Sequence, residues 1–257
     1  MTAEMYLVQI LQKYTAKSLI NYSQPISKLK NTLQFWASSC YVNILDSGSR
    51  AKGTAISLVS DVDYLVSLTS GCNENSGGLK SIYDGLYTKL NNSYQNVRKQ
   101  NVSVRINLGG LQVDVTPARK QNGLTNDHWV YLSKSGSRQQ TNIQKHITDI
   151  SQSGRTNEIK IIKIWRELNQ LDFPSIYLEY LIVKNILQYK GPDFASNAFY
   201  IFQELAKDTG NPLFARVVDP ANSNNILSDL LTATEKGKIM AKAKVAVSQQ
   251  YWEKIVW

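Results

Sequence analysis

The chain has few of the residues that bind structural zinc or form disulfides. Only two cysteines, Cys40 and Cys72, and two histidines, His128 and His146, occur among its 257 residues. They show no C-x-x-C or comparable spacing, which structural zinc sites in proteins usually have. We therefore expect neither a structural zinc site nor a disulfide framework.

Long apolar runs are also missing. No segment reaches the roughly 18 to 20 uninterrupted apolar residues that a membrane-spanning helix needs, and the N-terminus lacks the pattern of a signal peptide. We therefore expect no membrane partner and a cytoplasmic location. Hydrophobic residues make up 42% of the chain and charged residues 19%, which is typical of a folded protein, here of one large or two modest domains.

Acidic residues are fewer than basic ones. The chain has 29 Lys and Arg residues against 20 Asp and Glu residues, which gives a formal net charge of +9. Lysine and arginine attract phosphate, whether it belongs to a nucleotide or to a nucleic acid backbone. The charge alone fits either a polyanionic partner or a merely solubilising surface.

The periodicity of apolar residues predicts a helical segment over the first forty residues, then mixed strands and helices, and then a helical C-terminal part. Ser23 is expected to cap the second helix ahead of Pro25, and Pro117 to end the last strand. Residues 119–157 are polar and expected to be irregular, apart from a short helix at 143–150. The other predicted elements are strands at 41–45, 62–66, 102–106 and 111–115, and helices at 79–98, 159–168, 176–188, 197–207 and from 227 to the C-terminus.

Three aspartates in the mixed region are placed for divalent-metal chemistry. Asp61 and Asp63 alternate with apolar residues in S-D-V-D-Y-L-V, so both point to one face of a strand. Asp114 has the same alternation in L-Q-V-D-V. Mutual repulsion of such carboxylates favours a hard cation with oxygen ligands. Three acids on adjacent strands could hold two ions roughly 4 Å apart, the arrangement used for in-line phosphoryl displacement.

A Gly-Ser turn precedes these strands. Gly48 and Ser49 offer backbone N–H groups and a hydroxyl to phosphate, and a glycine permits close approach. Arg50 and Lys52 beside the turn either touch phosphate or face water. Taken singly, these features fit an ordinary turn and charged strand surfaces. Their order, a Gly-Ser turn, two acids on an apolar strand, a helix and a third acid in a hairpin, favours a phosphoryl-transfer site.

The sequence resembles the polymerase-β-type nucleotidyltransferase superfamily, and within it the CD-NTase-like branch of oligoadenylate synthetases and bacterial cyclic-oligonucleotide synthases. The matching segments, in family order, are G-S-x-A-K-G-T-A, S-D-V-D-Y-L-V and V-D-V-T-P-A. The resemblance spans most of residues 40–230. It implies an α+β fold, in which a polymerase-β-like core with a mixed sheet and helices is followed by an all-helical C-terminal lobe, with the active-site cleft between them. The core and the N-terminal spine helices would occupy residues 1–150, and the helical lobe residues 151–257.

The resemblance also implies the roles of single residues. Asp61, Asp63 and Asp114 would be the catalytic metal ligands, for two Mg²⁺ or Mn²⁺ ions. The triphosphate substrate, with ATP expected and other nucleoside triphosphates as alternatives, would meet a second set of residues. These nucleotide-binding residues would be Gly48, Ser49, Lys52, Lys163, Ser175 and Tyr177. The segment Asp219–Asn225 is similar to a D-P-x-x-P-x-N-N stretch in the helical lobe of this branch.

Two departures from the family pattern limit the comparison. Ile176 stands where relatives often have an aromatic residue after the serine, so the preferred donor base cannot be read from the sequence. The chain also lacks the Cys/His insertion with which animal DNA sensors of the branch bind duplex DNA. No motif therefore supports a nucleic acid activator.

The function expected from these features is the joining of nucleoside triphosphates into a cyclic or linear oligonucleotide second messenger, with release of pyrophosphate, in bacterial anti-phage signalling. One alternative keeps the nucleotidyl transfer but changes the acceptor to a tRNA end, a protein or a small molecule. Another is a non-catalytic nucleotide-binding partner. The three intact aspartates favour an enzyme, and the segment Asp219–Asn225 favours messenger synthesis.

Overall fold

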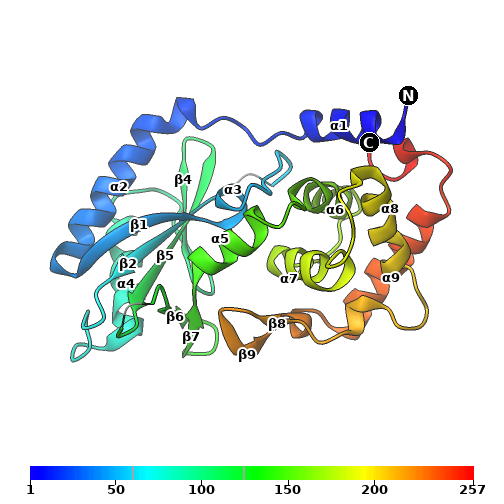
Figure 1. The fold of residues 1–257 in the computed structure, drawn as a ribbon. Coiled ribbons are helices and arrows are strands. Elements are labelled where there is room, and N and C mark those ends of the chain that lie inside the picture. Colours follow the sequence, from blue (N-terminus) through cyan, green and yellow to red (C-terminus); the bar gives the residue numbers. More distant parts are fainter. Residues whose placement is uncertain (60, 124) are drawn as a thin grey trace. The chain divides into compact units, whose positions relative to one another are not determined.

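A computed structural model of the chain describes residues 1–59, 61–123 and 125–257 (Figure 1). Ser60, the first residue of the S-D-V-D segment, and Leu124 lie outside the described residues. The chain divides into two compact units, which we call the sheet unit and the helical unit. The sheet unit comprises Lys17–Ala51 and Ser60–Ile147, and the helical unit comprises Met1–Ala16, Lys52–Val59 and Thr148–Trp257. The functional division into residues 1–150 and 151–257 stays a prediction.

The sheet unit contains a seven-stranded mixed sheet, and the α+β fold class is confirmed. Its main strand order is β1-β2-β5-β4-β3, while β6 pairs with β5 and β7. The pair β2 and β5 is parallel, whereas the other neighbours are antiparallel. The elements are α2 (Ser23–Ala37), β1 (Tyr41–Ser47), α3 (Gly48–Ala51), β2 (Val62–Leu68), α4 (Gly78–Asn91), β3 (Arg98–Lys99), β4 (Val104–Leu108), β5 (Leu111–Lys120), β6 (His128–Leu132) and β7 (Ser137–Thr141).

One face of the sheet forms a core with helices α2 and α4 (Figure 1). Val62 and Tyr64 of β2 and Val113 and Val115 of β5 are buried in this core. Each buried valine of this kind contributes about 1.5–3 kcal/mol, so the core strongly fixes the register of both strands. Because side chains alternate along a strand, the residues between them point to the opposite face, as the sequence predicted.

The helical unit is helical, as expected, except for a short two-stranded hairpin. Its apolar core includes Trp165, whose ring packs edge-on against Phe202. The elements are α1 (Ala3–Lys13), α6 (Thr156–Leu168), α7 (Ser175–Tyr180) with a π-helical continuation (Leu181–Ile186), α8 (Phe194–Leu205), β8 (Val218–Asp219), β9 (Asn222–Ile226) and α9 (Ala233–Val247). The short helix expected at 143–150 is α5 (Ile143–Ser151).

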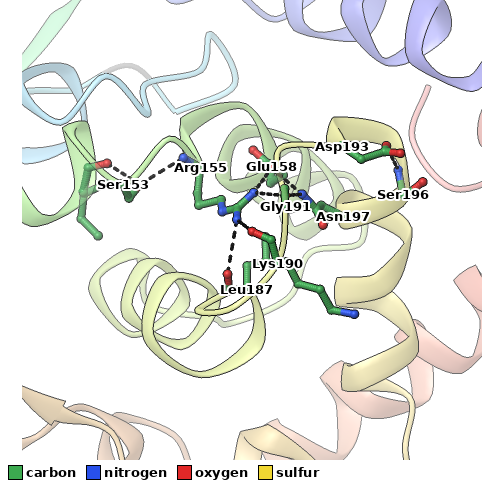
Figure 2. Close-up of polar contacts among 10 residues, drawn as sticks. Ser153, Arg155, Glu158, Leu187, Lys190, Gly191, Asp193, Ser196 and Asn197 are labelled. Carbon is green, nitrogen blue, oxygen red and sulfur yellow. Dashed lines mark hydrogen bonds and ion pairs between the residues drawn. The ribbon is translucent and has the colours of Figure 1, made fainter.

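Arg155 organises the turn that follows the π-helical segment (Figure 2). Its guanidinium donates hydrogen bonds to the carbonyl oxygens of Leu187 (3.4 Å), Lys190 and Gly191 (2.9 Å). The side-chain amide of Asn197 also donates to the Gly191 carbonyl, at 2.7 Å. Carbonyl groups that have no partner in a regular helix therefore find one in these two side chains.

Several expected element ends are wrong. The helix expected at 79–98 ends at Asn91, and the last long helix begins at Ala233 instead of residue 227. Ser23 is the first residue of α2 instead of its cap; the cap residue is Tyr22, and its side chain makes no capping hydrogen bond. Pro117 does not end β5, which continues to Lys120. Pro117 lies between Val115, the last β5 residue paired with β4, and Ala118, the first paired with β6. Pro117 pairs with neither β4 nor β6, so its missing N–H costs neither pair a hydrogen bond.

Residues 119–157 contain more regular structure than the sequence indicated. Strands β6 and β7 form a hairpin there, and β7 consists of the polar residues S-R-Q-Q-T. The side chains of β7 lie outside the core, and the strand is held by backbone hydrogen bonds to β6. Its sequence therefore lacks the apolar alternation from which strands are predicted.

Cys40 and Cys72 form a disulfide that the sequence did not predict, with Cα atoms 5.5 Å apart. The antiparallel pairing of β1 with β2, in which Tyr41 lies opposite Leu68, brings the two neighbouring cysteines together. None of the helices in the described part of the chain has both the length and the hydropathy of a membrane-crossing segment.

Candidate active site

Asp63 and Asp114 lie side by side in the middle of the sheet. They are direct partners in the parallel pair of β2 and β5, so their Cα atoms are neighbours across strands that run about 4.8 Å apart. The same row continues to Ser47 of β1 beside Asp63 and to Arg105 of β4 beside Asp114. The hydrophobic core on the other face thus positions two acidic side chains and one basic side chain in a row on this face.

Arg105 joins two of the three aspartates. Its Nε donates to Asp114 Oδ1 at 2.9 Å, and its Nη2 donates to Asp114 Oδ2 at 2.6 Å and to Asp61 Oδ2 at 2.8 Å. Burial raises the pKa of Asp61; the charge of Arg105 opposes this shift, and that of Asp114 adds to it. The pKa of Arg105 is raised, chiefly by its hydrogen bond to Asp114. The guanidinium therefore stays charged while it lies within the acidic row.

The acids fit a divalent cation in chemistry, although their present geometry is that of an arginine site. Carboxylate oxygens are the ligands that Mg²⁺ and Mn²⁺ prefer, and Arg105 shows that Asp61 and Asp114 share a cation. Among residues 1–59, 61–123 and 125–257, however, no three His, Cys, Asp or Glu side chains are arranged to hold a metal ion. The role of the three aspartates as metal ligands stays a prediction.

Gly48 packs directly against the carboxylate of Asp63. Its φ angle is +65°, and a Cβ atom at this position would lie 1.8 Å from Asp63 Oδ2. Both the backbone conformation and the space therefore require glycine. Ser49 follows in the short helix α3, and Arg50 donates to the carbonyl of Lys17 at 2.9 Å. The structure thus brings the Gly-Ser turn and the acids together, while phosphate contact by Gly48 and Ser49 stays a prediction.

Lys52 and Lys163 belong to the helical unit, where both bind Glu179. Lys163 Nζ lies 2.6 Å from Glu179 Oε1, and Lys52 Nζ lies 2.7 Å from Oε2. Thr54 donates to Glu179 at 2.9 Å and accepts from Lys163 at 2.9 Å. Only 2% of the Lys163 side chain and none of the Glu179 side chain is exposed. Burial alone would raise the pKa of Glu179, but the two ammonium groups outweigh it and lower the pKa to about 2.

Ser175 and Tyr177 lie at the start of α7 in the same unit. Ser175 Oγ accepts a hydrogen bond from Arg166 at 2.9 Å. Tyr177 is fully buried, stacks edge-on against Phe173, and donates from its hydroxyl to the Leu213 carbonyl at 2.8 Å. Both side chains have structural partners here, and their contact with a nucleotide stays a prediction.

The segment Asp219–Asn225 forms the hairpin of β8 and β9. Asp219 is buried; its Oδ1 accepts from the backbone N–H of Ala221 and its Oδ2 from the side chain of Asn225, both at 2.9 Å. The aspartate and the asparagine of this motif therefore close a tight turn, which gives the spacing a structural reason.

Sequence reasoning missed Arg105 and Glu179. The hairpin register could have revealed Arg105, because residues 105 and 114 are equally far from the turn at Gly109 and Gly110. Glu179 had a weaker signal, which was the run of apolar residues around Lys163 in α6. A lysine inside such a run needs a buried acid as its partner.

Comparisons with known proteins agree with this architecture. No protein-family model matches the chain. The cyclic AMP-AMP-AMP synthase of Escherichia coli (strain MS 115-1) is 22% identical over 290 residues, which cover 91% of this chain and 89% of the relative. The structure of E. coli MS115-1 CdnC with ATP superposes with a TM-score of 0.71 at 21% identity and covers 97% of this chain and 96% of that chain.

The Bradyrhizobium diazoefficiens CD-NTase CdnG in complex with GTP superposes with a TM-score of 0.73 at 10% identity, covering 96% of this chain and 91% of that chain. The chain has the nucleotidyltransferase fold. The resemblance to polymerase-β-type nucleotidyltransferases, and to their branch of bacterial cyclic-oligonucleotide synthases, is confirmed by these similarities. The nucleotidyltransferase fold extends over nearly the whole chain, so the row of Asp63, Asp114 and Arg105 belongs to this fold and not to an added segment.

Proposed function

We propose that this chain is a metal-dependent nucleotidyltransferase that joins nucleoside triphosphates into a cyclic or linear oligonucleotide messenger and releases pyrophosphate. The observation that carries the proposal is the row of Asp63 and Asp114 on adjacent strands, where Gly48 packs against Asp63. The Arg105 guanidinium links the third acid, Asp61, to Asp114. The similarity to a cyclic AMP-AMP-AMP synthase, which extends over most of both chains, supports messenger synthesis in particular.

Asp61, Asp63 and Asp114 would hold two Mg²⁺ or Mn²⁺ ions. Bound there, these ions would supply the positive charge that stabilises an in-line displacement at the α-phosphorus. In that displacement an acceptor ribose hydroxyl gives its proton to water and forms a new P–O bond, while the bond from the α-phosphorus to pyrophosphate breaks. Gly48 and Ser49 would orient the phosphates through backbone N–H groups and the serine hydroxyl.

The helical unit would contribute the remaining nucleotide contacts. Lys163 reaches a triphosphate only if its ammonium exchanges Glu179 and Thr54 for phosphate oxygens, and Lys52 has to leave the same carboxylate. Ser175 and Tyr177 would lie beside the donor base. ATP is the expected donor because relatives are named for AMP units and ATP. A cytoplasmic location and a role in bacterial anti-phage signalling complete the proposal.

The test is incubation of the purified protein with all four ribonucleoside triphosphates and Mg²⁺ or Mn²⁺, followed by phosphatase treatment and mass spectrometry. We expect a phosphatase-resistant cyclic product or a linear oligonucleotide. Asp63→Asn should lower its rate about a thousandfold, because the lost metal stabilisation is worth several kcal/mol. The substitution should not lower thermal stability, because it removes one charge from an acidic cluster. Full synthesis by Asp63→Asn would overturn the assignment of the site.

The net charge of +9 favours a second candidate, transfer of a nucleotide to the end of an RNA. The same reaction with labelled triphosphate and added tRNA separates the two functions. Label that enters the tRNA, without any small product, would replace messenger synthesis by terminal transfer. Metal-dependent triphosphate binding without product in either reaction would favour a small-molecule or protein acceptor or a non-catalytic partner.

A further inference from the structure

Arg105 occupies the space between two of the proposed metal ligands. Its side chain is 30% exposed, and those of Asp61 and Asp114 are 27% and 15% exposed, so the group lies at the edge of solvent. Three charge-assisted hydrogen bonds of 2.6–2.9 Å link the guanidinium to three of the four carboxylate oxygens. This bidentate geometry towards Asp114, with a bridge to Asp61, is the strongest form of arginine–carboxylate pairing.

A guanidinium and a divalent ion compete for the same oxygens. A Mg²⁺ ion needs oxygen ligands at about 2.0–2.1 Å in a nearly octahedral set, whereas a guanidinium holds each oxygen near hydrogen-bond distance and adds its own positive charge. The two cations also repel each other within such a small site. The bonds of Arg105 therefore oppose coordination by Asp61 and Asp114 as long as they persist.

Arg105 also borders open space on the sheet. A cavity of about 320 Å³ adjoins the arginine. Its lining residues are Asn96, Arg98, Gln100, Arg105, Ile106, Asn107 and Gln112. Arg105 Nη1 already donates to Gln112 Oε1 at 2.9 Å, so one branch of the guanidinium is anchored on the cavity side. Arg98 of β3 lies directly opposite Arg105 and repels it, which favours the position at the aspartates when no metal is present.

We infer that Arg105 is an internal counter-ion that holds Asp61 and Asp114 in place before metal binds, and that the first divalent ion has to displace it. Arg105 is thus a positioning residue: it stabilises the metal-free site and weakens the affinity of that site for metal. This inference rests on the proposed function, because it assumes that the aspartates bind metal. It predicts opposite effects of one substitution on metal affinity and on the stability of the metal-free protein, which a purely structural arginine would not give.

The experiment measures binding of Mn²⁺ alone, by the electron paramagnetic resonance signal of the free ion, together with thermal unfolding with and without Mn²⁺. Arg105→Gln should bind Mn²⁺ about tenfold more tightly, because the competing charge is gone. Its metal-free melting temperature should fall, and the rise in melting temperature on adding Mn²⁺ should exceed that of the unsubstituted protein. Arg138→Gln on β7 is the matched control, since it removes a charge from the same sheet away from the aspartates, and should change the affinity about twofold or less.

Arg105→Lys provides a second variant if Arg105→Gln does not fold. An ammonium keeps the charge but loses the bidentate fork, so the affinity for Mn²⁺ should rise by a smaller factor. Equal or weaker Mn²⁺ binding by the folded Arg105 variants would overturn the inference. If the unsubstituted protein shows no Mn²⁺ binding that Asp63→Asn abolishes, the metal site itself fails, and with it the proposed function. The two failures are therefore distinguishable.

Discussion

Gly48 touches Asp63 so closely that no other amino acid fits between the Gly-Ser turn and the acidic row. The Cβ of any substitute would lie 1.8 Å from Asp63 Oδ2 and 2.4 Å from Asp63 Cγ. The turn and the carboxylate are consequently one structural feature: a change in either displaces the other. Gly48 precedes Asp63 by fifteen residues, and the sequence alone does not show that they touch. The contact explains why position 48 needs a glycine.

We expect Gly48→Ala to lower activity about a hundredfold or more, because a catalytic group displaced by about 1 Å loses that much. Gly109→Ala is the matched control: Gly109 has a similar φ of +62°, but no atom lies within 4 Å of its added Cβ. Backbone strain should cost each variant about 1–2 kcal/mol of stability, the clash with Asp63 should cost Gly48→Ala more, and only Gly48→Ala should lose activity. Steady-state rates together with urea unfolding of both variants check this. Equal activity of the two would show that Asp63 does not depend on the turn.

Glu179→Gln should lower the free energy of unfolding by about 3–5 kcal/mol. The substitution leaves two ammonium groups, Lys52 and the buried Lys163, without the carboxylate that neutralises them. Urea denaturation measures the loss. Glu74→Gln at an exposed position should change stability by no more than about 0.5 kcal/mol. If both variants were equally stable, the three charges could not form the paired cluster described above.

Reduction of the Cys40–Cys72 disulfide should destabilise the sheet unit by about 3–4 kcal/mol, the chain-entropy value for a loop of this length. The two cysteines are 32 residues apart in sequence. Urea unfolding with and without dithiothreitol measures the effect, and a thiol titration shows the starting state. The double variant Cys40→Ser, Cys72→Ser should not respond to dithiothreitol. An unchanged unfolding curve for a protein shown to start oxidised would contradict the prediction.

The local alternation of apolar and charged residues made the acidic row predictable. Val62 and Tyr64 on one side and Asp61 and Asp63 on the other fix which face of the strand is buried, whatever the rest of the chain does. The partner of each acid was not predictable in this way. Arg105 meets Asp114 because β4 pairs with β5, and it reaches Asp61 because β2 lies on the other side of β5. Which strands pair is decided by the whole fold and not by the local sequence.

The buried cluster around Lys163 shows the same limit. A lysine on a helix is usually exposed, and only the surrounding Ile161, Ile162 and Ile164 indicate that this helix is buried on every side. The acid that neutralises it comes from α7, sixteen residues later. Likewise β7 escaped prediction because its residues are polar and its stability comes from backbone bonds to β6. Helix periodicity and strand alternation in a sequence indicate which residues are buried. They do not indicate which acid pairs with Lys163 or which strand pairs with β7.

Asp63 and Asp114 lie on interior strands, each with a neighbour on both sides in the order β1-β2-β5-β4. Backbone amides of interior strands exchange with solvent only when a large part of a domain opens. The two carboxylates therefore keep their relative placement until the sheet itself melts. For protein engineering this means that outlying strands such as β3 and the polar strand β7 can be altered extensively while the spacing of the acids stays constant.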